Sequence, residues 1–160
     1  MLLEVKRKIE PNVFYKAESF HFSAKIINES NLLNGRGGPF IVNAMFALEL
    51  YLKSVLSTTV FGNGHESEGG VRYDQVYSKS DFKGKGHNLF TLYEQLPESI
   101  KSELELLSQS EPISLSSFFD TYKNHFIEWR YSYEGNAKSY KPHDILSVLN
   151  TFNIWASKEL

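Results

Sequence analysis

Apolar residues recur every three or four positions along most of the chain, which is the spacing of one face of a helix. The first run predicts a helix over about 12–28, and Pro11 and Asn12 before it are typical of a helix start. The second run predicts a helix over about 39–57 that is apolar on most sides. A helix of that kind is expected to lie at the centre of the fold.

Later apolar runs are separated by residues that begin or end helices. They predict further helices over about 88–96, 98–108, 114–134 and 142–158. The run over 114–134 carries a stripe of aromatic side chains, and Gly135 after it suits a left-handed C-cap. The pattern therefore predicts an all-α, up-and-down bundle of about five to six helices. We expect 39–57 and 114–134 to be its central antiparallel pair, with Phe46 and Phe126 buried.

The segment from about 58 to 86 shows no helical pattern and is rich in glycine. A loop of this length in a compact chain is usually functional or contains structure of its own. Residues 71–77, with the sequence VRYDQVY, are the best candidate there for a short strand or hairpin.

Composition narrows the class of protein. The chain has 160 residues, 41% of them hydrophobic and 22% charged, and its formal net charge is -2. These values predict one ordinary globular domain over 1–160 and no basic surface overall. The absence of cysteine excludes disulfides, cysteine zinc sites and cysteine nucleophiles. We see no apolar leader and no segment apolar enough for a membrane span, so we expect a cytoplasmic protein.

The first candidate site is a charged pair within the apolar second helix. Glu49 and Lys53 are four residues apart, so they lie only about 40° apart around a helix, in the same sector as Phe46. Glu ahead of Lys at this spacing is a favourable ion pair. The pair is either part of a binding site or an ordinary ion pair at the edge of the core.

The second candidate is the segment EWRYSYE, which contains Arg130, Tyr131 and Glu134. An arginine fork suits phosphate or carboxylate groups, and aromatic rings beside it suit nucleic-acid bases. Arg130 and Glu134 are also spaced for pairing on a helix. The alternative is structural: the aromatic stripe is core and Arg130 pairs internally, for example with Glu49. In either case we expect Glu49, Lys53 and Arg130 to lie close together.

The third candidate is the segment KGKGHN, which precedes the helix over 88–96. Its glycines permit a tight turn, and Lys85 adds positive charge near a helix start. His87 is a candidate acid–base group. The alternative is that His87 and Asn88 together cap the helix.

We expect neither a metal nor a cofactor. The remaining histidines have no partner at the spacing of metal ligands, and no phosphate-loop, nucleotide-binding or G-x-S-x-G motif is present.

Three segments in this order resemble the HEPN domain superfamily of bacterial defence and toxin–antitoxin systems. They are ALELYLKSVL at 47–56, GHNLFTL at 86–92, and the residues from 126 to 134. The resemblance implies a helical bundle that forms a homodimer across its two long helices. It also implies RNA or a partner protein, such as a nucleotidyltransferase-like antitoxin, as the binding target.

Many HEPN proteins are metal-independent ribonucleases, whose signature is an arginine followed after four to six residues by histidine. Arg130 matches the arginine, but Gly135, Asn136 and Ala137 stand where the histidine would be. The resemblance therefore implies a binding protein that acts in phage defence, stress response or a toxin–antitoxin system. The alternative is an active endoribonuclease that uses a different set, with Arg130 steadying phosphate and His87 as the acid–base group.

Overall fold

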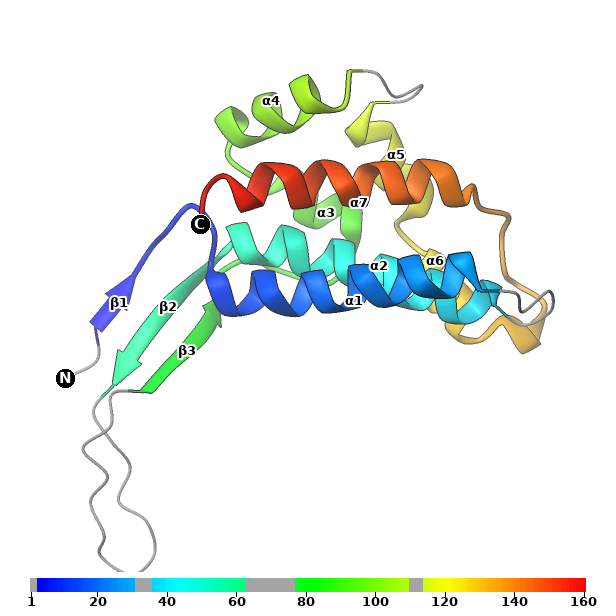
Figure 1. The fold of residues 1–160 in the computed structure, drawn as a ribbon, viewed down its shortest axis with the longest axis horizontal. Coiled ribbons are helices and arrows are strands. Elements are labelled where there is room, and N and C mark those ends of the chain that lie inside the picture. The colour runs from blue at the N-terminus through cyan, green and yellow to red at the C-terminus, as the bar shows by residue number, and fades with distance from the viewer. Residues whose placement is uncertain (1–2, 31–35, 63–76, 110–113) are drawn as a thin grey trace, which may run out of the picture.

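A computed structural model describes residues 3–30, 36–62, 77–109 and 114–160. In these residues the chain is mostly helical, with a small sheet at one end of the helices (Figure 1). The elements follow in the order β1 (Leu3–Val5), α1 (Pro11–Glu29), α2 (Gly37–Val55), β2 (Ser57–Gly62), β3 (Tyr77–Phe82), α3 (Leu89–Glu94), α4 (Glu98–Leu107), α5 (Leu115–Tyr122), α6 (His125–Arg130) and α7 (Pro142–Ser157), with a 3₁₀ turn at Ser132–Glu134.

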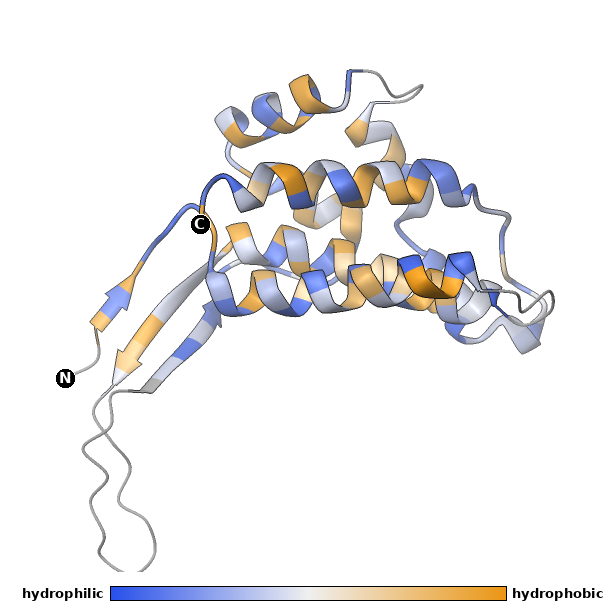
Figure 2. Cartoon of the chain, viewed as in Figure 1, coloured by the Kyte–Doolittle hydropathy of each residue, from blue (hydrophilic) through white to orange (hydrophobic). Residues whose placement is uncertain are grey.

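Three long helices form the body of the molecule. α1 runs side by side with α2 and α7 and in the direction opposite to both (Figure 1). α2 is buried on most sides, and Leu48 and Leu52 have no exposed surface. This confirms the helix that was expected to be central. α7 is amphipathic, with hydrophobic and hydrophilic residues alternating along it (Figure 2), and it buries Ile145 and Leu149.

The prediction of one continuous helix over 114–134 is wrong. α5 ends at Tyr122, and a turn at Lys123 and Asn124 separates it from α6. Hydrogen bonds to a later segment hold this break: the Tyr122 hydroxyl accepts the Lys141 backbone N–H at 3.1 Å, and His125 Nε2 donates to the Ser139 carbonyl at 3.0 Å. Because of the break, the second central helix is absent, and the long neighbours of α2 are α1 and α7.

The expectation of a loop over 58–86 is wrong for residues 58–62 and 77–82, which lie in strands β2 and β3. β2 is the central strand of an antiparallel sheet with the order β1-β2-β3, in which Ser57 pairs with Phe82 and Leu3 pairs with Phe61. The predicted all-α class is therefore incomplete, because it does not include this sheet. Residues 71–76 of the expected hairpin lie outside the described residues, while Tyr77 begins β3.

A buried carboxylate joins the sheet to the helices. Glu10 is the N-cap of α1, and its side chain accepts the Val13 backbone N–H at 2.9 Å. The same carboxylate accepts the hydroxyl of Thr59 in β2 at 3.0 Å and that of Ser80 in β3 at 2.6 Å. Glu10 is 1% exposed, so one side chain fixes the start of α1 and two strands together.

Candidate functional site

A pocket of about 560 Å³ opens between α2, the start of α3, and α6. It brings together four residues that the sequence singled out in three separate segments. They are Glu49 and Lys53 of α2, His87 before α3, and Arg130 at the end of α6. Met45, Phe46, Leu50, Leu89, Phe126 and Ile127 supply its apolar lining.

The polar centre of the pocket is a cluster of Glu49, Lys53 and His87. Glu49 Oε1 lies 2.7 Å from Lys53 Nζ and 2.8 Å from His87 Nδ1. Lys53 Nζ also lies 3.0 Å from His87 Nδ1. The side chains of Glu49 and Lys53 are largely buried, whereas that of His87 is 81% exposed. The cluster therefore presents an imidazole to solvent from a buried ion pair.

Local backbone geometry places His87 there. Gly86 has a φ of +79°, in the left-handed region that glycine adopts without a steric penalty. Asn88 caps α3 by accepting the Thr91 backbone N–H at 3.2 Å. Asn88 alone therefore makes the side-chain cap, and His87 turns back to α2. This corrects the alternative in which both residues cap the helix.

Two tautomers of His87 are compatible with these contacts. A protonated Nδ1 donates to the Glu49 carboxylate and leaves a lone pair on the exposed Nε2. An unprotonated Nδ1 accepts from the Lys53 ammonium and leaves a proton on Nε2. The exposed nitrogen can therefore accept or donate a hydrogen bond while the ring stays in one position.

Arg130 lies at the exposed edge of the pocket, on an aromatic surface. Its guanidinium carbon is 6.0 Å from the centre of the Phe126 ring and 5.5 Å from that of Tyr131. Within the described part of the chain, no carboxylate lies within 4.0 Å of it, so the expected pairing with Glu49 or Glu134 is wrong. The helix ends at Arg130, which removes the spacing that would have brought Glu134 alongside.

Other expectations are only partly met by this geometry. Phe46 and Phe126 are partly buried pocket walls rather than fully buried core residues. Lys85 lies outside the pocket, where its backbone N–H donates to Gln95 Oε1 at 2.8 Å. Glu134 also lies outside it, exposed in the 3₁₀ turn.

Lys123, which no sequence pattern singled out, also lines the pocket. Its Nζ is 2.8 Å from the carboxylate of Asp120 and 6.0 Å from the centre of the Phe90 ring. Lys123 stands in the turn between α5 and α6. Its place in the pocket therefore depends on a helix break that apolar periodicity does not reveal.

Among the described residues, no group of three or more histidine and carboxylate side chains is placed to hold a metal ion. No helix in the described ranges is long and apolar enough to cross a membrane. In comparisons with known proteins, no family model, no curated protein and no solved structure matches the chain.

Proposed function

We propose that the chain is a HEPN-like RNA-binding protein, and that the pocket between α2 and α6 binds a phosphodiester of the RNA. The observation that carries the proposal is the convergence of Lys53, Lys123 and Arg130 on one pocket together with His87. Within the described residues Glu49 is the one acid lining the pocket, and Asp120, which does not line it, pairs with Lys123. Three cations thus face two carboxylates there, although the chain has a net charge of -2. A local excess of positive charge is what phosphate binding requires.

The chemistry of the individual side chains supports RNA in particular. The Arg130 guanidinium is exposed and can form paired hydrogen bonds to phosphate oxygens. Tyr131, whose ring lies against Arg130, is 40% exposed, and Tyr133 next to it is 80% exposed, so aromatic surface is available for stacking with unpaired bases. Phosphate contacts and base stacking thus lie side by side.

Fluorescence anisotropy with a labelled single-stranded RNA tests the proposal. Arg130→Ala and Lys123→Ala should each weaken binding about 5- to 100-fold and lower the salt dependence by roughly one phosphate contact. Lys16→Ala, on the exposed surface of α1, is the matched control and should leave affinity unchanged. Equal affinity of all four proteins would exclude this pocket as the RNA site.

A second candidate function is metal-independent endoribonuclease activity, and the contact between Glu49 and His87 favours it. With Nδ1–H held by Glu49, Nε2 can take the proton from a ribose 2′-hydroxyl as its oxygen attacks phosphorus. The bond from phosphorus to the 5′-oxygen breaks, that oxygen takes up a proton from water, and the His87 imidazolium returns its proton to solvent. Lys53 and Arg130 would stabilise the charge that develops on the phosphate oxygens.

Incubation of RNA with the purified protein in EDTA tests this activity. The expected products end in 2′,3′-cyclic phosphate, and His87→Ala should reduce the rate at least 100-fold. His143→Ala is the matched control, because the His143 side chain is 85% exposed and lies outside the pocket. If the RNA binds but is not cleaved, the result would support RNA binding and exclude ribonuclease activity.

The biological setting is also part of the proposal. A cytoplasmic protein of phage defence, stress response or a toxin–antitoxin system fits an RNA-binding pocket of this kind. A nucleotidyltransferase-like protein is the partner that the resemblance implies. Co-purification with the product of a neighbouring gene would test that association.

A further inference from the structure

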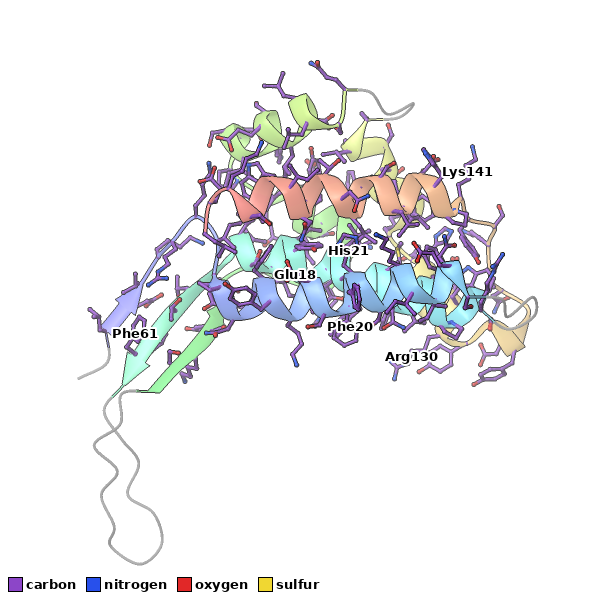
Figure 3. The ribbon with its side chains drawn as sticks, viewed as in Figure 1. Glu18, Phe20, His21, Phe61, Arg130 and Lys141 are labelled. Carbon is purple, nitrogen blue, oxygen red and sulfur yellow. The ribbon has the colours of Figure 1, made fainter. Side chains whose placement is uncertain are left out.

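A second hollow lies between α1 and α7, away from the pocket described above. It has a volume of about 470 Å³, and α1 contributes Glu18, His21 and Lys25 to it. Asn150 and Asn153 of α7 form the facing wall. In Figure 3, Glu18 and His21 lie on the side of α1 that faces α7, whereas Arg130 is drawn on the side away from α7.

The floor of this groove is a hydrogen-bond network in which the donor and acceptor roles can be assigned. Asn153 Nδ2 donates to the Tyr51 hydroxyl oxygen at 3.3 Å, so that hydroxyl is free to donate its own proton to His21 Nδ1, 2.9 Å away. Burial raises the pKa of Tyr51, which keeps the hydroxyl protonated. His21 therefore carries its ring proton on Nε2.

His21 in turn orients Asn150. Burial lowers the pKa of His21 and a hydrogen bond with Asn150 opposes this to a smaller extent, so the ring stays neutral at pH 7. With its proton on Nε2, His21 can act only as a donor to the Asn150 side-chain oxygen, and in that orientation the Asn150 amide N–H is free to donate to a ligand. A carbonyl group of a ligand would accept it.

Two opposite charges stand at the two ends of the groove without pairing. Glu18 and Lys25 are seven residues apart on α1, so they share a face but are separated by about 10 Å along the helix. In the described ranges, neither has an oppositely charged group within 4.0 Å. Glu18 Oε2 accepts the Asn153 amide at 3.1 Å, and Oε1 remains available.

We propose that this groove binds a short zwitterionic peptide between Glu18 and Lys25. The peptide ammonium pairs with Glu18, a peptide carbonyl accepts the Asn150 amide N–H, and the terminal carboxylate pairs with Lys25. An extended tripeptide spans about 10 Å, which matches the rise along α1 from Glu18 to Lys25. Because the charges of the groove cancel, a polyanion such as RNA or a nucleotide gains little there.

Calorimetric titration of the full chain with trialanine tests the proposal directly. Free trialanine should bind, and both N-acetyl-trialanine and trialanine amide should bind at least 10-fold more weakly. Absence of binding by free trialanine at 10 mM, or equal binding of the blocked peptides, would overturn the proposal. So would binding of adenosine monophosphate in place of the peptide.

Variants then assign the two ends of the peptide. In Glu18→Gln, acetylation of the peptide should no longer matter, and in Lys25→Met amidation should no longer matter. Lys16→Met is the matched control, since Lys16 lies about 180° around α1 from Lys25. Peptide preferences that stay unchanged in both groove variants would place the peptide elsewhere and refute the assignment.

Discussion

At the scale of single residues, Glu10 shows how far one polar side chain can organise this fold. It is a carboxylate with 1% exposure, and its described partners are a backbone N–H, an amide and two hydroxyls rather than a cation. A buried carboxylate is tolerated only when such donors satisfy it. Its position before Pro11 marks a helix start in the sequence, but its contacts with β2 and β3 depend on strands that the apolar pattern did not predict.

Removal of this carboxylate should destabilise the protein strongly. Glu10→Ala leaves the donors of Val13, Thr59 and Ser80 without this partner and should lower the free energy of unfolding by about 3 kcal/mol or more. Glu10→Gln keeps one acceptor oxygen and should cost less. Urea unfolding at pH 7 measures both.

The control for this prediction is Glu94→Gln, a change at an exposed acid at the end of α3. It should alter the free energy of unfolding by less than about 0.5 kcal/mol. If Glu10→Ala unfolds as the wild type does, the network around Glu10 contributes nothing to stability.

At the scale of elements, long amphipathic helices were predictable and their interruptions were not. α1, α2 and α7 each bury a face that recurs every three or four residues, and local spacing alone reveals such a face. The break at Lys123 and Asn124 depends instead on hydrogen bonds to residues 139–141, which are distant in sequence. At such a position, tertiary contacts outweigh the local helix propensity.

The sheet was missed for a different reason. β2 has the sequence STTVFG, in which Thr58, Thr59 and Val60 are β-branched residues that favour strands. That signal was present in the sequence but short, and it directly follows the apolar α2. Glycines further along then favoured a loop over the whole segment.

The residues of the candidate site also differ in whether local sequence spacing could predict them. Glu49 and Lys53 could be paired from their spacing on one helix, which the structure places at 2.7 Å. His87 was a candidate from its glycine-rich segment, but its contact with Glu49 requires the fold. Lys123 could not be found, because the turn that brings it to the pocket is itself a tertiary feature.

At the scale of the whole molecule, α2 separates two hollows of different electrostatic character. Glu49 and Tyr51 are two residues apart and so point about 160° away from each other, one to each hollow. Among the described residues, Lys53, Lys123 and Arg130 line the pocket by α6 with Glu49, and Asp120 pairs with Lys123, whereas Glu18 and Lys25 line the groove by α7. The net charge of -2 is therefore an average over hollows whose local charges differ.

The last prediction concerns the association of two copies of the chain. Ile127 of α6 is 61% exposed and Tyr133 is 80% exposed, so apolar and aromatic surface stands open beside Arg130. A twofold contact there would cover this surface and bring two Arg130 side chains to one cleft, as the HEPN resemblance implies. Sedimentation at micromolar concentration should then give twice the chain mass of 18.4 kDa. Ile127→Glu should shift the protein to monomer, whereas Ile154→Glu, at a position 50% exposed on α7, should leave the dimer intact. A wild-type chain that sediments as a monomer would refute the dimer, and the proposed RNA site would then be a single pocket in each molecule.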